Sequence, residues 1–216
     1  MTVKVADENH VPGSGELLNA LTHAAGVMAS VAGTVFLIIK ALPIENSRYL
    51  VSFSIFGTSL ILLYTSSTLY HALRGENIKM IFRRIDHAAI YILIAGTYTP
   101  FLLTQVRDPQ GQVFFIIIWT IAIAGIILNV SRKIPPRWIS ASIYICMGWI
   151  AVIPYKELIR DIPRLNLCLI LAGGLIYTSG TIFYVWKKLP YNHAIWHIFV
   201  IGGSACHYFA VYFLMG

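Results

Sequence analysis

The sequence predicts an all-α membrane protein, a seven-transmembrane helical bundle with a cytoplasmic amino terminus. Composition is the first observation, since 57% of the 216 residues are hydrophobic and only 12% are charged. A soluble domain carries roughly a quarter charged residues. The second observation is that the charges leave seven uncharged stretches. Their length is the third, because a helix that crosses ~30 Å of hydrocarbon needs about 20 residues.

We expect one domain, with residues 1–16 as a polar cytoplasmic segment and residues 17–216 as the transmembrane domain. The successive apolar residues Phe114, Phe115 and Ile116 do not alternate with polar ones, which excludes the strands of an outer-membrane barrel. The predicted spans, of which the fifth is the shortest, are about 17–39, 49–73, 87–106, 109–131, 138–155, 165–186 and 191–214.

Turn-forming residues lie in each connector or at its edge, which supports the division. In chain order they include Pro43, Gly75, Pro109, Pro135, Pro163 and Pro190.

The orientation follows from the distribution of the 16 Lys and Arg residues. Ten lie in the amino-terminal segment and in the connectors after the second, fourth and sixth spans, and six lie on the other side. Positive residues favour the cytoplasm, so we expect the amino terminus inside and the carboxyl terminus outside. The net charge of +7 suits anionic lipid headgroups beside the loops, and we expect no nucleic-acid partner.

Polar residues inside the spans are the candidate functional residues, because placing them in lipid is costly. His193 and His197 are four residues apart and share one helix face, a spacing that can bind one divalent metal ion. Ser67 and His71 share a face near the end of the second span, and Asp86 precedes the third. The predicted topology brings these residues to one depth in the membrane.

Three histidines form the ligand set of many catalytic zinc sites and leave one position for water. A nearby carboxylate can orient that water or accept its proton. Simpler interpretations stay open from the residues alone. The histidine pair could face solvent among the headgroups, Asp86 could pair with Arg83 or Arg84 or cap its helix, and Ser67 could bond a carbonyl of its own helix.

The motifs resemble those of the bacterial haemolysin III-related proteins, within the progestin and adipoQ receptor family. The resemblance covers nearly the whole chain and rests on Ser67-x3-His71, on Asp86 with the five residues after it, on the run 95–101 (Ala-Gly-Thr-Tyr-Thr-Pro-Phe), and on His193-x3-His197. It implies seven helices, a bacterial inner-membrane location, and Zn²⁺ held by the residues matching His71, His193 and His197. Asp86 would lie beside the metal-bound water, and Ser67 would belong to the same polar cluster.

Three further histidine and asparagine positions have weaker signals. Asn19 and His23 fall in the first turns of the first span, where they could line the same cavity or face the headgroups. His207 lies ten residues beyond His197, which is ~15 Å along a helix. We therefore expect His207 to bond a neighbouring helix rather than the same metal.

Three functions are compatible with these residues. The first is a zinc-dependent hydrolase of lipid amides or esters, similar to a ceramidase, in which Asp86 is the general base and Ser67 positions water or polarises the carbonyl. The second is a non-enzymatic regulator of membrane fluidity and energy homeostasis that responds to a membrane lipid or fatty-acyl ligand. The third, a pore-forming cytolysin, fits least, since residues 1–16 do not resemble a secretion signal. The oligomeric state stays open.

Overall fold

The computed structural model describes residues 14–106, 109–131, 135–153 and 155–215, and most of the predicted cytoplasmic segment 1–16 lies outside these ranges. Every regular element in the described ranges is helical. The elements are α1 (Ser14–Ala41), α2 (Ser47–Ala72), α3 (Glu76–Thr104), α4 (Pro109–Ser131), α5 (Arg137–Gly148), the 3-10 turn η1 (Trp149–Val152), α6 (Tyr155–Asp161), α7 (Arg164–Val185), α8 (Asn192–Tyr212) and the 3-10 turn η2 (Phe213–Met215).

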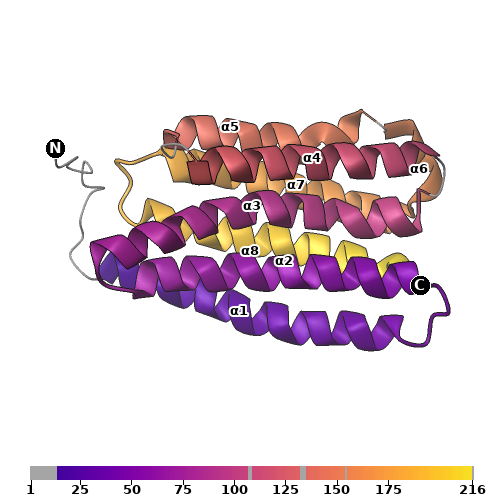
Figure 1. The fold of residues 1–216 in the computed structure, drawn as a ribbon, viewed down its shortest axis with the longest axis horizontal. Helices are drawn as coiled ribbons and strands as arrows, with labels where there is room; N and C mark the ends of the chain where they lie inside the picture. Colours follow the sequence, from indigo (N-terminus) through magenta and orange to yellow (C-terminus); the bar gives the residue numbers. More distant parts are fainter. Residues whose placement is uncertain (1–13, 107–108, 132–134, 154, 216) are drawn as a thin grey trace.

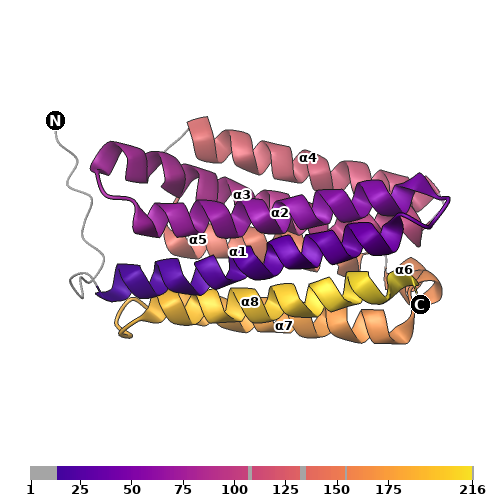
Figure 2. The same cartoon turned by 90° about the horizontal axis from the view of Figure 1, so that it is seen from below.

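The long helices lie side by side along one axis (Figures 1 and 2). Helix α2 packs between α1 and α3, α7 packs along α8, and α4 packs on the far side of α3. Contacts between α1 and α8 join the first and last helices. The bundle therefore has one end at which α1, α3 and α8 begin and α2 finishes, which we call the histidine end.

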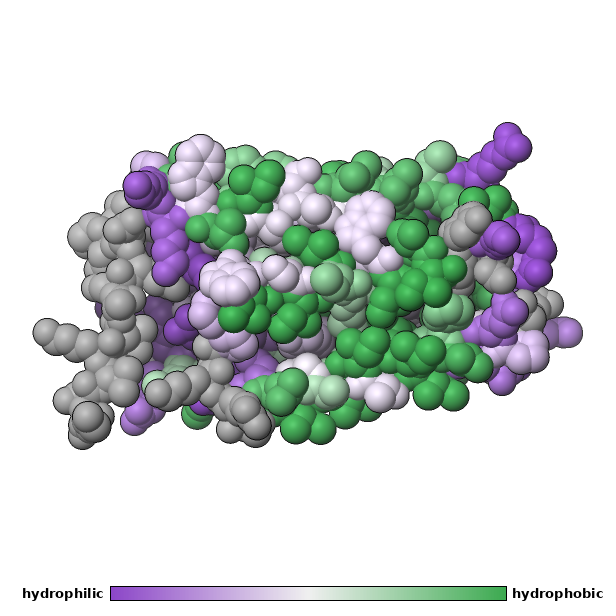
Figure 3. Space-filling view, turned by 90° about the horizontal axis from the view of Figure 1, so that it is seen from above, coloured by the Kyte–Doolittle hydropathy of each residue, from purple (hydrophilic) through white to green (hydrophobic). Residues whose placement is uncertain are grey.

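The surface is apolar where a soluble protein would be polar. Phe36 and Ile116 are 61% and 63% exposed. On the face seen in Figure 3 the hydrophobic residues cover most of the middle, and the hydrophilic residues gather at the two ends. Among the described residues, six helices are long and apolar enough to cross a membrane. The chain is therefore a multi-pass membrane protein.

The fifth predicted span, 138–155, is not one continuous helix. Helix α5 has 12 residues and gives way to the four-residue turn η1. The hydroxyl of Tyr98 on α3 donates to the Gly148 carbonyl at 2.5 Å and accepts from the Ala151 amide at 3.1 Å. Irregular backbone at this depth is tolerated when protein groups satisfy its hydrogen bonds, and Tyr98 does so here.

Helix α3 begins at Glu76, well before the predicted span 87–106. Gly75, with φ of 104°, supplies the turn that precedes it. The charged first turns contact α1, where Lys79 Nζ donates to Glu16 Oε1 at 3.0 Å, and further along α3 the Arg84 carbonyl accepts from Asn129 Nδ2 of α4 at 2.9 Å. Asp86 consequently lies inside the helix, and the interpretation that it caps the helix start is wrong.

Candidate metal centre

Two helices distant in sequence bring three histidines together at the histidine end. His71 comes from α2, and His193 and His197 come from the first two turns of α8. One ring nitrogen from each lies within 4.8 Å of the other two. The ring centroids are 4.6 to 5.2 Å apart. These three residues are the histidine cluster.

The turn before α8 directs its first residues into the bundle. Tyr191 has φ of 56° and ψ of 21°, the left-handed backbone conformation that residues other than glycine rarely adopt. The Asn192 amide donates to the Leu189 carbonyl at 3.2 Å, which closes the turn. Helix α8 therefore starts directly at Asn192, so that His193 and His197 lie one helical turn apart on the face toward α2.

The donor atoms of the histidine cluster fit a divalent metal ion. His197 is 1% exposed and His71 is 7% exposed. His71 Nε2 and His193 Nδ1 are buried without a hydrogen-bond partner among the described residues. Such orphaned polar atoms are rare in native proteins and indicate a ligand. Imidazole nitrogens suit zinc, which binds them at about 2.1 Å, so binding would draw the rings closer together.

Ser67 and Asp86 lie beside the histidine cluster on the wall of the same cavity. The Ser67 hydroxyl, one turn before His71 on α2, lies beside the Asp86 carboxylate on α3. Arg83, one turn before Asp86, acts on this carboxylate through its positive charge. The pair thus places a carboxylate and a hydroxyl on the same cavity wall as the three imidazoles.

Asn19 and His23 of α1 lie against the histidine cluster and on the cavity wall. The Asn19 carbonyl is 3.1 Å from His197 Nδ1. The His23 ring stacks on the His197 ring, with centroids 3.5 Å apart and planes 17° apart, and its edge meets Tyr64. Both predicted positions therefore contact a candidate metal ligand directly.

A cavity of about 700 Å³ extends from the histidine cluster along the bundle. It begins beside Glu16 and Tyr191 and reaches Ile162 and Leu167, near the opposite end. Its volume lies within the range of small-molecule sites, roughly 300 to 1,000 Å³. Most of its wall is aliphatic or aromatic, so the cavity suits a long apolar molecule with one reactive end at the histidines.

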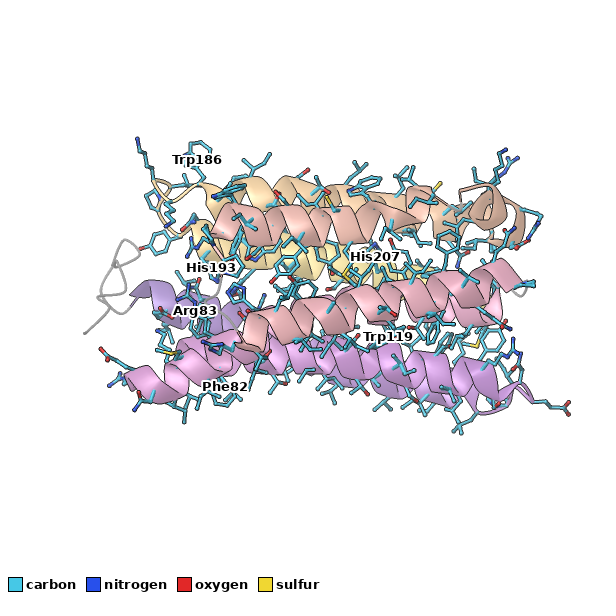
Figure 4. The ribbon with its side chains drawn as sticks, turned by 45° about the horizontal axis from the view of Figure 1, so that its top comes forward. Phe82, Arg83, Trp119, Trp186, His193 and His207 are labelled. Atoms are coloured by element: carbon cyan, nitrogen blue, oxygen red, sulfur yellow. The ribbon has the colours of Figure 1, made fainter. Side chains whose placement is uncertain are left out.

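His207 lies near the middle of the bundle, while His193 and Arg83 lie at the histidine end (Figure 4). His207 Nε2 is 3.1 Å from the Ile170 carbonyl of α7. The prediction that His207 bonds a neighbouring helix is confirmed.

Four residues near the cluster were not predicted as site residues: Glu16, Arg83, Arg137 and Tyr144. All four line the cavity. Glu16 has a sequence signal, because Glu16, Asn19 and His23 recur three and four residues apart and so share one face of α1. Arg137 and Tyr144 come from α5, where the Arg137 guanidinium lies over the Tyr184 ring at 5.3 Å. No spacing along the chain connects α5 to the histidines.

A family model described as "Haemolysin-III related" matches residues 14–208. The chain belongs to the haemolysin III-related family. This match spans all the residues that line the cavity, from Gly15 to His207, so the cavity and the histidine cluster belong to the part that defines the family.

Relatives of this haemolysin III-related protein span nearly its whole length. It is 45% identical to the "Hemolysin-3 homolog" of Bacillus subtilis (strain 168) over 92% of this chain and 93% of the relative. It is also 45% identical to "Hemolysin-3" of Bacillus cereus, over 92% and 90% of the two chains. The human "Monocyte to macrophage differentiation factor" is 26% identical over 90% of this chain and 82% of its own, in agreement with the progestin and adipoQ receptor family. No solved structure matches the chain.

Proposed function

We propose that this haemolysin III-related protein is a zinc-dependent membrane hydrolase that cleaves an amide or ester bond of a membrane lipid or fatty-acyl compound. The observation that carries this proposal is the histidine cluster itself. Its three imidazoles, two buried and that of His193 half-buried, offer nitrogens within 4.8 Å of one another and open onto a cavity of about 700 Å³. Three protein ligands with a remaining position for water are characteristic of catalytic zinc sites.

The neighbouring side chains supply the acid–base chemistry. Zinc, when bound by the three histidines, supplies a Lewis acid and a water molecule acidified for attack. The Asp86 carboxylate accepts the proton that water loses as its oxygen bonds to the carbonyl carbon. The same carboxylic acid then protonates the departing amine or alcohol when the carbon–nitrogen or carbon–oxygen bond breaks. The Ser67 hydroxyl, beside this carboxylate, can donate to it and orient it.

The cavity favours a lipid over a water-soluble substrate. Its far wall is formed by aliphatic side chains such as Leu158, Ile162 and Leu167. A polar, water-soluble substrate would lose its hydrogen bonds to water there, whereas an acyl chain has none to lose. A lipid whose amide or ester group lies at the histidine cluster would place its acyl chain along this wall.

Metal analysis and turnover together test the proposal. Detergent-purified wild type should contain about one zinc per chain, since the site offers one set of three ligands, and His71→Ala and His193→Ala/His197→Ala should contain none. Asp86→Asn should keep zinc but lose hydrolysis of lipid amides and esters, because an amide cannot accept the proton. A wild type that contains no metal, when purified without chelator, would rule out the hydrolase.

A regulator without enzymatic activity is the second candidate, and the length of the cavity favours it. A ligand that fills the cavity contacts α3, α5, α7 and α8 at once, so its fit could bias how these helices pack. A strain that lacks the gene and carries Asp86→Asn should then respond to added lipid as a strain that carries the wild-type gene does. Zinc binding with turnover lost in Asp86→Asn would instead favour the hydrolase.

The pore-forming function suggested by the name of the Bacillus cereus relative has its own assay. Purified protein in liposomes would release a trapped dye without added substrate if it formed a pore. We expect no release, because the exposed faces of the helices are apolar and suit lipid contact.

We further propose that the chain crosses the bacterial inner membrane seven times, with α5 and η1 as the fifth crossing and the histidine end in the cytoplasm. The 16 residues from Arg137 to Val152 are apolar but shorter than the other spans. A tilted or locally thinned bilayer accommodates a short span at modest cost.

A further inference from the structure

Helix α1 supplies no member of the histidine cluster, yet it contacts two of its three residues. The contact with His71 is made by Glu16, in the first turn of α1. Glu16 Oε2 lies 2.7 Å from His71 Nδ1, and Glu16 Oε1 lies 3.0 Å from Lys79 Nζ on α3. One carboxylate therefore holds a histidine of α2 and a lysine of α3 at the same time.

The bond to Glu16 determines which nitrogen His71 can offer to a metal. A carboxylate can only accept, so Nδ1 carries the proton and donates it to Glu16. Nε2 is then left with its lone pair. The structure shows His71 Nε2 buried without a hydrogen-bond partner among the described residues, while the whole His71 side chain is 3% exposed. The orphaned atom is thus the one that Glu16 leaves available.

His197 is held by α1 in the same manner. Its Nδ1 lies 3.1 Å from the Asn19 carbonyl and 3.1 Å from the Thr22 hydroxyl. A backbone carbonyl accepts only, so Nδ1 again carries the proton. The stacked ring of His23 fixes the plane of the imidazole. His197 consequently presents Nε2, as His71 does.

We propose that Glu16 is a positioning residue of the metal centre, which sets the tautomer and the orientation of His71 and so raises metal affinity. This inference rests on the zinc site proposed above. Carboxylates that accept from the far nitrogen of a metal-bound histidine increase its basicity, and their loss typically costs about 10- to 100-fold in metal affinity. Lys79 keeps Glu16 in place, because its ammonium occupies the other carboxylate oxygen.

The alternative is that Glu16 only ties α1 to α2 and α3. The two roles differ in what they predict for the metal-free protein. A structural tie would lower the stability of the metal-free and metal-bound forms equally and leave metal affinity unchanged. If Glu16 positions His71, its replacement lowers the affinity for zinc. It also alters the visible absorption bands of the cobalt-substituted protein, because those bands depend on the ligand field that the histidines create.

The experiment measures zinc affinity by chelator competition on full-length protein in detergent, with thermal unfolding of the metal-free form alongside. Glu16→Ala should bind zinc about 10- to 100-fold more weakly than wild type. Glu16→Gln, which can still accept a hydrogen bond but carries no charge, should fall between them. Glu76→Gln is the matched control, since Glu76 is an exposed glutamate in the first turn of α3, and its affinity should equal that of wild type.

Each outcome separates this inference from the proposed function. Wild-type affinity in both Glu16 variants, with unchanged cobalt spectra, would overturn the positioning role and leave the zinc site intact. A wild type that binds neither zinc nor cobalt would overturn the proposed function, and the positioning role with it. If Glu16→Ala fails to fold, the affinity of Glu16→Gln relative to Glu76→Gln decides the question.

Discussion

At the scale of single residues, the helices approach one another where a glycine faces a large side chain. Gly203 of α8 faces Tyr177 of α7, and a Cβ at Gly203 would lie 2.8 Å from the Tyr177 ring. Gly26 of α1 meets Tyr64 in the same way, at 2.4 Å. Small residues let membrane helices pack closely, since lipid provides no hydrophobic force between them. These contacts set the helix spacing on which the histidine cluster depends.

Adjacent glycines of α8 allow this idea to be tested. Gly203→Ala should destabilise the protein by about 1–3 kcal/mol, because the added methyl overlaps the base of the Tyr177 ring, which cannot swing away. Gly202→Ala is the control, since its Cβ would meet only Ile176 at 3.5 Å. Thermal unfolding in detergent compares the two. Equal stabilities would show that the Tyr177 contact does not limit helix packing.

At the scale of elements, the change from α5 to η1 shapes the cavity wall. Trp149, the first residue of η1, donates from Nε1 to Thr178 Oγ1 of α7 at 3.0 Å. Tyr98 satisfies the freed backbone groups from the α3 side. Tyr98 belongs to the run 95–101 that carried the family resemblance, so part of that run stabilises the interrupted helix rather than the histidine cluster.

Tyr98→Phe tests whether Tyr98 stabilises the junction of α5 and η1, because this change removes only the hydroxyl. Tyr98→Phe removes the hydroxyl's bonds to the Gly148 carbonyl and from the Ala151 amide, and the loss of two hydrogen bonds should lower the free energy of unfolding by roughly 1–3 kcal/mol. Tyr191→Phe, at a side chain 44% exposed, should have little effect. Thermal unfolding in detergent measures both, and a Tyr98→Phe variant as stable as wild type would contradict this assignment.

At the scale of the whole molecule, the direction of the helices bears on topology. Helix α1 starts at the histidine end, and the carboxyl end of the chain lies at the opposite end of the bundle (Figure 1). Termini at opposite ends of the bundle are what the proposed seven crossings require. The excess of Lys and Arg on the side of the histidine cluster favours the cytoplasm for that side.

Reporter fusions test this orientation. Alkaline phosphatase fused after Gly216 should be active, because the carboxyl terminus is expected outside, and a fluorescent protein fused there should be dark. Fusions after Lys188, in the connector before α8, should give the reverse. Reversed results at both positions would mean an inverted protein, and identical results would mean that α8 does not cross.

Much of the candidate site could be predicted because depth in a membrane follows from position along a span. Ser67 and His71 fall near the end of α2, and His193 and His197 fall at the start of α8, so the predicted topology already placed them together. Their closeness within the membrane plane could not be predicted, because it depends on which helices are neighbours. The start of α3 was misjudged for a related reason, since its charged turns make contacts with other helices, Lys79 with Glu16 of α1 and Arg84 with Asn129 of α4.

The sequence by itself determined the membrane class, the apolar spans, the family and the identity of the three histidines. Those properties depend on composition and on spacing along one chain. The tertiary structure decided that Glu16 holds His71, that α5 ends early against Tyr98, and that a cavity connects the histidine cluster to the far end. In lipid a helix is apolar on every side, so its pattern does not reveal which face meets a neighbour. Only packing between helices determines that.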